Sequence, residues 1–417
     1  MTADNEARVK AMAAKAASYV LARAPSPVRS RALLNMADRI WERREEILKA
    51  NALDLEDFKS RGGSGALADR LLLNEKRLKE ACDGLRQVAS LQDPVGEVVE
   101  GWRTRHGLEI RKVRVPLGVV AVVYEARPNV TIDISGLAIK SGNAVVLRGG
   151  AEAINSNRAI VGAMKAGLEG LVPVDSIQLI ESTDRRLVDE LLKLDELIDV
   201  AIPRGGASFI KHVKEIATVP VIETGAGNCH IFVNLDADFE MANRIIVNAK
   251  VQRPSVCNAV RKVLVHRDIA RDYIPLLMEA MRKHSVRVRG CEVTRSIAGD
   301  VEEATEQDWY EEYMDLTLAV KVVNSVEEAV EHINRYGTKH SDAIITKNIR
   351  DANYFTWNVD SACVYVNAST RFTDGGQFGF GAEVGISTQK LHARGPMALR
   401  ELTTTKYIIM GDGQLRE

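Results

Sequence analysis

The chain has 417 residues, a formal net charge of −1, 46% hydrophobic residues and 27% charged residues. This length suggests two or three domains, and the balanced charge gives no reason to expect nucleic acid or an anionic membrane as a partner. The longest purely apolar run, VVAVVY (119–124), is far too short to span a bilayer, and the N-terminal segment, with Asp4 and Glu6, is not typical of a signal peptide.

The five cysteines are spread widely along the chain, and none belongs to a CxxC pair or to a Cys/His cluster with metal-ligand spacing. We therefore expect no metal site and no disulfide framework. Free thiols fit a reducing compartment, so we expect a cytoplasmic protein.

The first 106 residues are predicted to be mostly helical. Apolar residues recur at three- and four-residue spacing in RALLNMADRIWERREEIL (31–48), and RGGSG (61–65) interrupts the pattern. In 107–117 apolar residues alternate, with a change of phase between Ile110 and Val113, which predicts a bulged strand or a hairpin.

From 118 to 253 short apolar runs alternate with helical patterns, which predicts a parallel sheet covered on both faces and a doubly wound, nucleotide-binding type of domain. The predicted strands are 118–124, 144–147, 177–180, 197–202, 219–222 and 230–233. The predicted helices are 129–140, 153–169, 184–193 and 205–215.

The same alternation continues through 254–370 and predicts a second α/β domain. Its expected strands are 260–265, 316–323, 342–346 and 362–366, and its expected helices are 268–284, 325–336 and 348–357. The acidic stretch 291–309 lacks a clear period and is predicted to be a loop. A return segment (371–401) precedes a β-prone end (402–417), which we expect to be an edge strand that pairs with another subunit.

Cys257 lies on a short connector, because Pro254 prevents the preceding helix from continuing and a strand pattern follows. Connectors commonly hold reactive groups, yet a free cysteine is more often a buried, inert side chain. The residues alone leave both roles open.

Four stretches rich in glycine or polar residues come directly after predicted strands: 125–129, 148–153, 203–208 and 223–228. Ligands of open parallel sheets bind at these strand ends. The usual glycine fingerprint of dinucleotide-binding domains is absent, because GAGNCH (225–230) lacks one glycine and precedes a strand.

Several segments together resemble the aldehyde dehydrogenase superfamily, and within it the branch that reduces an acyl phosphate in proline biosynthesis. They are IETGAGNCH (222–230), SVCNA (255–259), YEARPNVTID (124–133), KSGNAVVLRGG (140–150), the long stretch 360–397 and ELTTTKY (401–407). The resemblance implies an α/β fold of aldehyde dehydrogenase type, with two parallel-sheet domains and a small β flap for oligomerisation. It makes 118–253 the NADP-binding domain, with 1–106 as its helical part, 254–370 the catalytic domain, and 107–117 with 402–417 the oligomerisation strands.

The activity implied is the NADPH-dependent reduction of L-glutamyl 5-phosphate to L-glutamate 5-semialdehyde, with release of phosphate, through a thioester on Cys257. A homo-oligomer is implied as well. The acyl phosphate would come from a separate glutamate 5-kinase, a candidate for transient contact.

By resemblance, Asn129 donates to the oxyanion together with the Cys257 backbone N–H, and Glu223 matches the carboxylate that activates water in hydrolytic relatives. The implied cofactor residues are Arg148, Gly205, Gly206 and Glu312. The implied substrate residues are Arg127, Arg253, Asn367, Ser369 and Arg371. Arg253 would also favour the Cys257 thiolate.

Two other functions remain open. Glu223 is compatible with a hydrolytic, NAD-dependent dehydrogenase of a small aldehyde, although the stretch 360–397 argues against it. A scaffold that only binds nucleotide is the second alternative, and the presence of Cys257, Asn129 and Glu223 argues against that. Each arginine could equally be a structural ion-pair partner.

Overall fold

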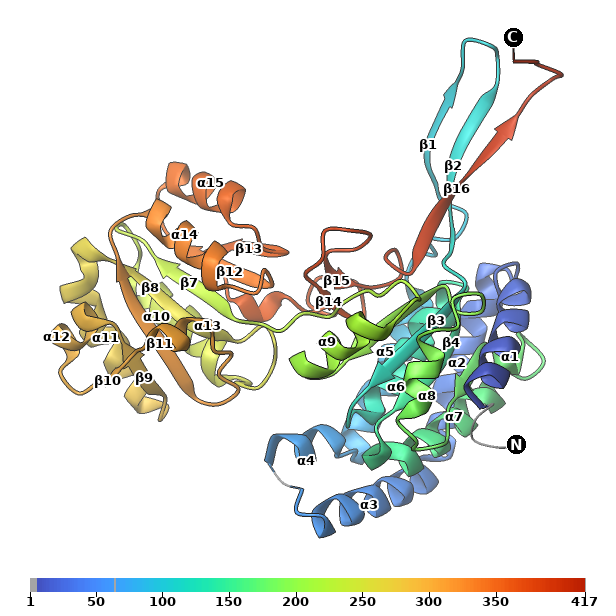
Figure 1. Cartoon of the computed structure of the whole chain (residues 1–417), viewed down its shortest axis with the longest axis horizontal. Helices are drawn as coiled ribbons and strands as arrows, with labels where there is room; N and C mark the ends of the chain where they lie inside the picture. The colour runs from blue at the N-terminus through green and yellow to red at the C-terminus, as the bar shows by residue number, and fades with distance from the viewer. Residues whose placement is uncertain (1–5, 64, 417) are drawn as a thin grey trace. The chain divides into compact units, whose positions relative to one another are not determined.

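The computed structural model describes residues 6–63 and 65–416, and the chain divides into two compact units (Figure 1). Unit 1 comprises Met1–Thr224, Gly379–Gly385 and Met397–Glu417, and unit 2 comprises Gly225–Phe378 and Ile386–Pro396. The division falls after residue 224, earlier than the boundary expected at 253. The reason is that strand β7 (Cys229–Val233) and helix α10 (Phe239–Val251) build the core of unit 2.

Unit 1 begins with helices, as predicted. They are α1 (Glu6–Leu21), α2 (Ser26–Glu42), α3 (Arg44–Ser60), α4 (Gly65–Leu71) and α5 (Glu75–Ser90). The apolar repeat at 31–48 forms two helices, because the chain leaves helical geometry at Arg43.

A four-stranded parallel sheet in the order β5-β4-β3-β6 follows. Its strands are β3 (Val119–Tyr124), β4 (Ala144–Gly149), β5 (Ile177–Leu179) and β6 (Val200–Arg204), and the helices between or after them are α6 (Pro128–Lys140), α7 (Ile154–Leu168), α8 (Arg186–Leu191) and α9 (Ala207–Ile216). The segment 219–222 is not a regular strand and makes a single bridge, from Val221 to Ala201. The chain order reverses between β3 and β6, which is where open sheets of this kind bind ligands.

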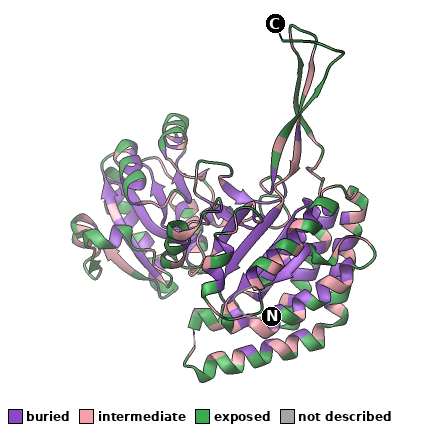
Figure 2. Ribbon diagram, turned by 45° about the vertical axis from the view of Figure 1, so that its right-hand side comes forward, coloured by how far each residue is buried: buried purple, intermediate pink, exposed green. Residues whose placement is uncertain are grey.

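Helices cover both faces of this sheet, and their apolar sides face it (Figure 2). On one face, alanines of α1 and leucines of α8 pack on Val119, Ala121 and Val123 of β3. Every residue of β3 is buried, so the prediction of a sheet covered on both sides is confirmed.

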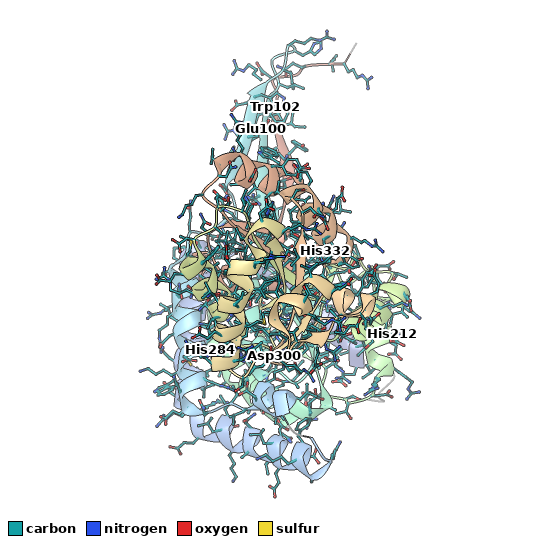
Figure 3. All side chains as sticks on the ribbon, turned by 90° about the vertical axis from the view of Figure 1, so that its left-hand side faces the viewer. Glu100, Trp102, His212, His284, Asp300 and His332 are labelled. Atoms are coloured by element: carbon teal, nitrogen blue, oxygen red, sulfur yellow. The ribbon has the colours of Figure 1, made fainter. Side chains whose placement is uncertain are left out.

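The predicted hairpin exists as β1 (Val98–Arg103) and β2 (Glu109–Pro116), and β16 (Thr403–Met410) pairs with the other side of β2. This three-stranded antiparallel flap extends away from the rest of unit 1, with Glu100 and Trp102 on it (Figures 1 and 3). The irregularity lies in β1, between Val98 and Glu100, opposite the predicted change of phase. The C-terminal strand therefore pairs with β2 of its own chain along one edge, and its other edge has no partner among the described strands.

Unit 2 holds a seven-stranded parallel sheet in the order β10-β9-β11-β8-β7-β12-β13. Besides β7 its strands are β8 (Val260–His266), β9 (Arg287–Gly290), β10 (Glu302–Glu303), β11 (Thr317–Val323), β12 (Ser341–Ile345) and β13 (Cys363–Val366). Helices α10 and α11 (Arg267–Lys283) cover one face, and α14 (Val326–Tyr336) and α15 (Ile349–Asn358) cover the other. His332 of α14 belongs to the second of these layers (Figure 3).

One prediction for unit 2 was wrong. The stretch 291–309 is not a loop, because it contains α12 (Glu292–Ala298), β10 and α13 (Glu306–Tyr310). A capping box formed by Thr305 and Asp308 starts α13, and the short helix was not recognised within an acidic sequence. The strand expected at 260–265 is confirmed as β8, and all seven of its residues are buried, including Arg261 and Lys262.

Candidate active site

Cys257 lies on the connector between α10 and β8, as predicted, and is half-buried. Cys229 and Cys363 lie in strands and Cys82 in a helix, and all three are buried. Burial raises the pKa of Cys82 to about 11 and also raises the pKa of Cys229. Among these four thiols, Cys257 is the one that solvent reaches.

Gly227 comes closest to the backbone of Cys257. A Cβ added at Gly227 would overlap the carbonyl oxygen of Cys257, so only glycine fits there. The thiol of Cys229 donates to the same carbonyl oxygen at 3.2 Å. Two neighbouring segments at the amino edge of the sheet therefore fix the Cys257 backbone from one side.

Arg371 stands beside Cys257. The two groups are close enough for the cysteine to affect the pKa of Arg371, although burial is the main influence and lowers it. Arg371 donates to Gln252 Oε1 at 3.0 Å and to the side chain of Asn258. Asn258 in turn donates to the carbonyl of Thr373 at 2.9 Å, so the residue after the cysteine holds the arginine segment in place.

The other substrate candidates differ in position. Asn367 follows the carboxyl end of β13, the opposite edge of the sheet from Cys257, and its amide bonds both the N–H and the C=O of Thr346. Asn367 thus holds a strand end, so the structure does not support a substrate contact for it. Ser369 accepts the Arg371 N–H at 3.3 Å, and Arg253 is exposed on the Cys257 connector.

In unit 1, Asn129 is exposed in the first turn of α6, where Nδ2 lies 3.4 Å from the carboxylate of Asp133. Burial raises the pKa of Asp133 to about 6. Ala126, before the helix, has φ +24°, and half-buried Arg127 occupies the N-cap position. Strain of this kind is frequent at functional sites.

Gly205 and Gly206 follow β6, at the point where the strand order reverses. Gly206 is the N-cap of α9, and a Cβ there would meet open space. Its N–H donates to Glu125 Oε2 at 3.1 Å, which joins the ends of β3 and β6. The start of α9 is thus open at Gly206, and backbone N–H groups at a helix start favour anions such as a phosphate.

Arg148, near the end of β4, is buried rather than on the surface. Its guanidinium donates to the carbonyls of Gly149 and, at 3.1 Å, of Thr183, and burial lowers its pKa. Its Nε has no hydrogen-bond partner in the part of the chain that the structure describes. The arginine is therefore fixed in place with part of its donor capacity unused.

The two carboxylates occupy different units. Glu223 pairs with Lys214 of α9 at 2.6 Å in unit 1. Glu312, in unit 2, accepts the N–H of Gly227 at 2.8 Å and lies 3.6 Å from Arg261 Nη2. The sequence had suggested a capping role or a catalytic role for Glu223, and the structure shows an ion pair.

The family model described as the aldehyde dehydrogenase family matches residues 1–319. The chain belongs to the aldehyde dehydrogenase family. It is 57% identical to the gamma-glutamyl phosphate reductase of Caldanaerobacter subterraneus subsp. tengcongensis, over 99% of this chain and 100% of the relative. It is 55% identical to the protein of that name from Clostridium botulinum (strain Alaska E43 / Type E3), with the same coverage.

A crystal structure of gamma-glutamyl phosphate reductase from Thermotoga maritima superimposes with a TM-score of 0.96 at 51% identity, covering 99% of this chain and 100% of that one. The predicted fold class and family are confirmed. Membership of the aldehyde dehydrogenase family implies a nicotinamide cofactor. Unit 1 fits such a group, because the strand-order reversal, the open start of α9 and the unused Nε of Arg148 belong to one sheet.

Sequence reasoning missed several residues around Cys257: Gly227, Asn258, Arg261, Lys250 and Lys262. A signal was present, because two adjacent cations, Arg261 and Lys262, interrupt a strand of a sheet expected to be covered on both faces. None of the described helices is both long enough and apolar enough to cross a bilayer.

Proposed function

We propose that the chain reduces L-glutamyl 5-phosphate to L-glutamate 5-semialdehyde with NADPH and releases phosphate. The observation that carries the proposal is the half-buried Cys257, on a backbone-fixed connector beside Arg371, in a chain 57% identical to a gamma-glutamyl phosphate reductase. This combination offers a nucleophile and a cation for an acyl phosphate at one place.

The Cys257 thiolate attacks the acyl carbon, and the carbonyl oxygen becomes an oxyanion. Asn129 and the Cys257 backbone N–H donate to that oxygen; an amide donor needs no change of protonation state. The C–O bond to phosphate then breaks and leaves a thioester, which divides one difficult reduction into two easier steps. Arg371 and Arg253 are the cations that we assign to the departing phosphate, with Arg127 and Ser369 as further substrate contacts.

NADPH, when bound, supplies the hydride that reduces the thioester. Arg148, Gly205, Gly206 and Glu312 are the residues that we assign to it, with Arg148 at the 2′-phosphate. The thiohemiacetal on Cys257 then collapses, the C–S bond breaks and the aldehyde leaves. Glu223 has no required step in this sequence, because no water attacks the thioester, and its ion pair with Lys214 is compatible with a structural role.

We also propose that the protein is a cytoplasmic homo-oligomer that associates through the flap. Several side chains of the flap are exposed and apolar: Val98, Val99, Trp102, Tyr407, Ile409 and Met410. The outer edges of β1 and β16 are unpaired among the described strands, and such edges favour pairing between chains. A separate glutamate 5-kinase would supply the acyl phosphate.

The reverse reaction tests the proposal. Purified protein is given glutamate semialdehyde and NADP, and NADP reduction is followed with and without inorganic phosphate. Phosphate must attack the Cys257 thioester to complete the reaction, so the rate should rise with phosphate and saturate, and arsenate should replace it. Steady turnover in phosphate-free buffer that is lost in Glu223→Gln would instead establish the hydrolytic alternative.

A further inference from the structure

Arg261 is a fully buried arginine whose guanidinium bonds the backbone of the Cys257 connector. It lies in β8 with 0% of its surface exposed. Its guanidinium donates to the carbonyl of Val256 at 2.8 Å and to the carbonyl of Ala259. These carbonyls belong to the residue just before Cys257 and to the second residue after it, so one side chain holds the connector on both sides of the cysteine.

Glu312 links this guanidinium to the segment that contacts Cys257 from the other side. Glu312 Oε1 lies 3.6 Å from Arg261 Nη2 and accepts the Gly227 N–H at 2.8 Å. Gly227 is the residue whose Cβ would overlap the Cys257 carbonyl oxygen. The Cys257 backbone is thus enclosed by two segments that share the Arg261–Glu312 pair.

Stability alone does not explain a buried cation here. A buried ion pair usually contributes no more to stability than apolar side chains of the same volume, because both ions lose their hydration. Lys250 and Lys262 lie nearby, and burial, reinforced by the charge of Arg261, lowers the pKa of each to about 7. A guanidinium cannot lose its proton in proteins, so Arg261 is the fixed positive charge of this group.

We propose that Arg261 is a positioning residue for Cys257. It fixes the backbone of the connector on both sides of the cysteine and keeps a permanent positive charge at that backbone. The inference rests on the proposed function, since it takes Cys257 as the nucleophile. Glu312 is the counter-charge, and it partly offsets the electrostatic effect of Arg261 on the thiol.

Other charged groups surround the same connector from neighbouring elements. The cations are Arg253 on the connector, Arg371, Lys250 of α10 and Lys262 of β8. The acidic groups are Glu312, Asp374 and Asp342 of β12, and the thiol of Cys229 in β7 stays neutral because burial raises its pKa. Arg261 differs from all of them in bonding the connector backbone on both sides of Cys257.

The experiment measures the alkylation of Cys257 by iodoacetamide as a function of pH, without cofactor, by mass spectrometry of the peptide that contains it. The midpoint is the pH at which the alkylation rate reaches half of its maximum. Arg261→Met removes the positive charge, so this midpoint should move to higher pH. The alkylation rate at pH 7 should then fall about tenfold, as expected for a shift of one pH unit. Glu312→Gln removes the counter-charge, so the midpoint should move to lower pH. A connector that was merely loosened would not give opposite shifts.

Arg261→Lys keeps the positive charge but loses the guanidinium N–H groups that bond the carbonyls of Val256 and Ala259. It should leave the alkylation midpoint near that of the parent protein and lower kcat by roughly 10- to 100-fold, with the KM for NADPH unchanged, because the sulfur is misplaced. Arg29→Met is the matched control, since Arg29 is a buried arginine of unit 1 paired with Asp93. It should lower Tm and leave both the midpoint and kcat unchanged.

The inference is overturned if Arg261→Met, or Glu312→Gln where the former does not fold, shows the parent midpoint, and if Arg261→Lys shows the parent kcat. Failure of the proposed function has a different signature. In that case Cys257→Ala retains turnover, whatever the alkylation profiles of the Arg261 and Glu312 variants are.

Discussion

The inner strands β3 and β8 of the two parallel sheets bury different kinds of residue. In unit 1, β3 is apolar throughout, and the buried cation Arg148 lies only near the end of the neighbouring β4. The candidates Asn129, Gly205 and Gly206 lie beyond the strand ends, in the first turn of α6 and just before α9. In unit 2, β8 buries Arg261 and Lys262 within the strand. A parallel sheet can thus support a site in two ways. Its strands can end where the loops that follow supply the site residues, or a strand can bury charged side chains next to the loop that contains the reactive residue. The first arrangement suits a bound cofactor, and the second suits a nucleophile that must be kept ionised and in place.

The strongest test of this division is Cys257→Ala. Reduction should fall by on the order of 10⁴-fold, because the covalent step is lost, while NADPH binding by fluorescence titration stays near normal because unit 1 is intact. Cys291→Ala is the control, since Cys291 is a half-buried thiol at the start of α12. Substantial residual turnover in Cys257→Ala would end the covalent mechanism.

Asn129→Ala asks whether unit 1 also contributes to the chemistry. Removing an oxyanion donor should lower kcat by about 10²- to 10³-fold with little change in the KM for NADPH. Asn155→Ala is the matched control, because Asn155 is another asparagine in the first turn of a unit 1 helix, bonded to Asp54. A kcat within twofold of the parent in Asn129→Ala would restrict unit 1 to cofactor binding.

Arg148→Ala tests the proposed contact between unit 1 and the cofactor without changing Cys257. The preference for NADPH over NADH should fall by about 1.5–3 kcal/mol, because a charge-assisted contact to the 2′-phosphate is lost. The measurement is kcat/KM with each cofactor, with Tm as a check, since the guanidinium also bonds the carbonyls of Gly149 and Thr183. Equal efficiency with both cofactors in the unaltered protein would remove this assignment.

Lys250→Met isolates the energetic cost of burying charge in unit 2. Lys250 is 0% exposed, and its Nζ has no hydrogen-bond partner within the described residues. Its pKa is about 7 in the folded protein and 10.5 ordinarily, so below pH 7 folding keeps a charge buried at full cost. Methionine should therefore raise the free energy of unfolding by about 1–4 kcal/mol at pH 6.

The advantage of Lys250→Met should shrink as the pH rises from 7 towards 10.5, because the unfolded chain then binds the proton that folded Lys250 has lost, and the parent protein gains stability. Urea unfolding at pH 6 and pH 10 measures the difference. Lys49→Met, at a surface position of α3, is the control. A gain of the same size at both pH values would mean that packing, not charge, decides the effect.

Much of the fold could be predicted because the strands of a parallel sheet that is covered on both faces have short apolar sequences. Strands β3, β4 and β7 follow that rule. The position of Cys257 on a connector was predictable from Pro254 and from the strand pattern that follows it. The connector's supports were not, because Gly227, Arg261 and Glu312 come together only through strand order, which local patterns do not encode. The position of Asn367 was not predictable either, since this residue of a recognised segment bonds the backbone of Thr346 at the opposite edge of the sheet.

The central position of β2 in the flap also has a consequence for synthesis. β1 can pair with β2 as soon as the hairpin is made, but the other side of β2 waits for β16, and Arg114 bonds Thr403 across 289 residues of chain. At about 5–20 residues per second, that edge stays open on the ribosome for roughly 15–60 s. The nascent chain therefore carries an unpaired, partly apolar β edge through the time in which the whole of unit 2 is made, and the flap is closed only once β16 has been translated.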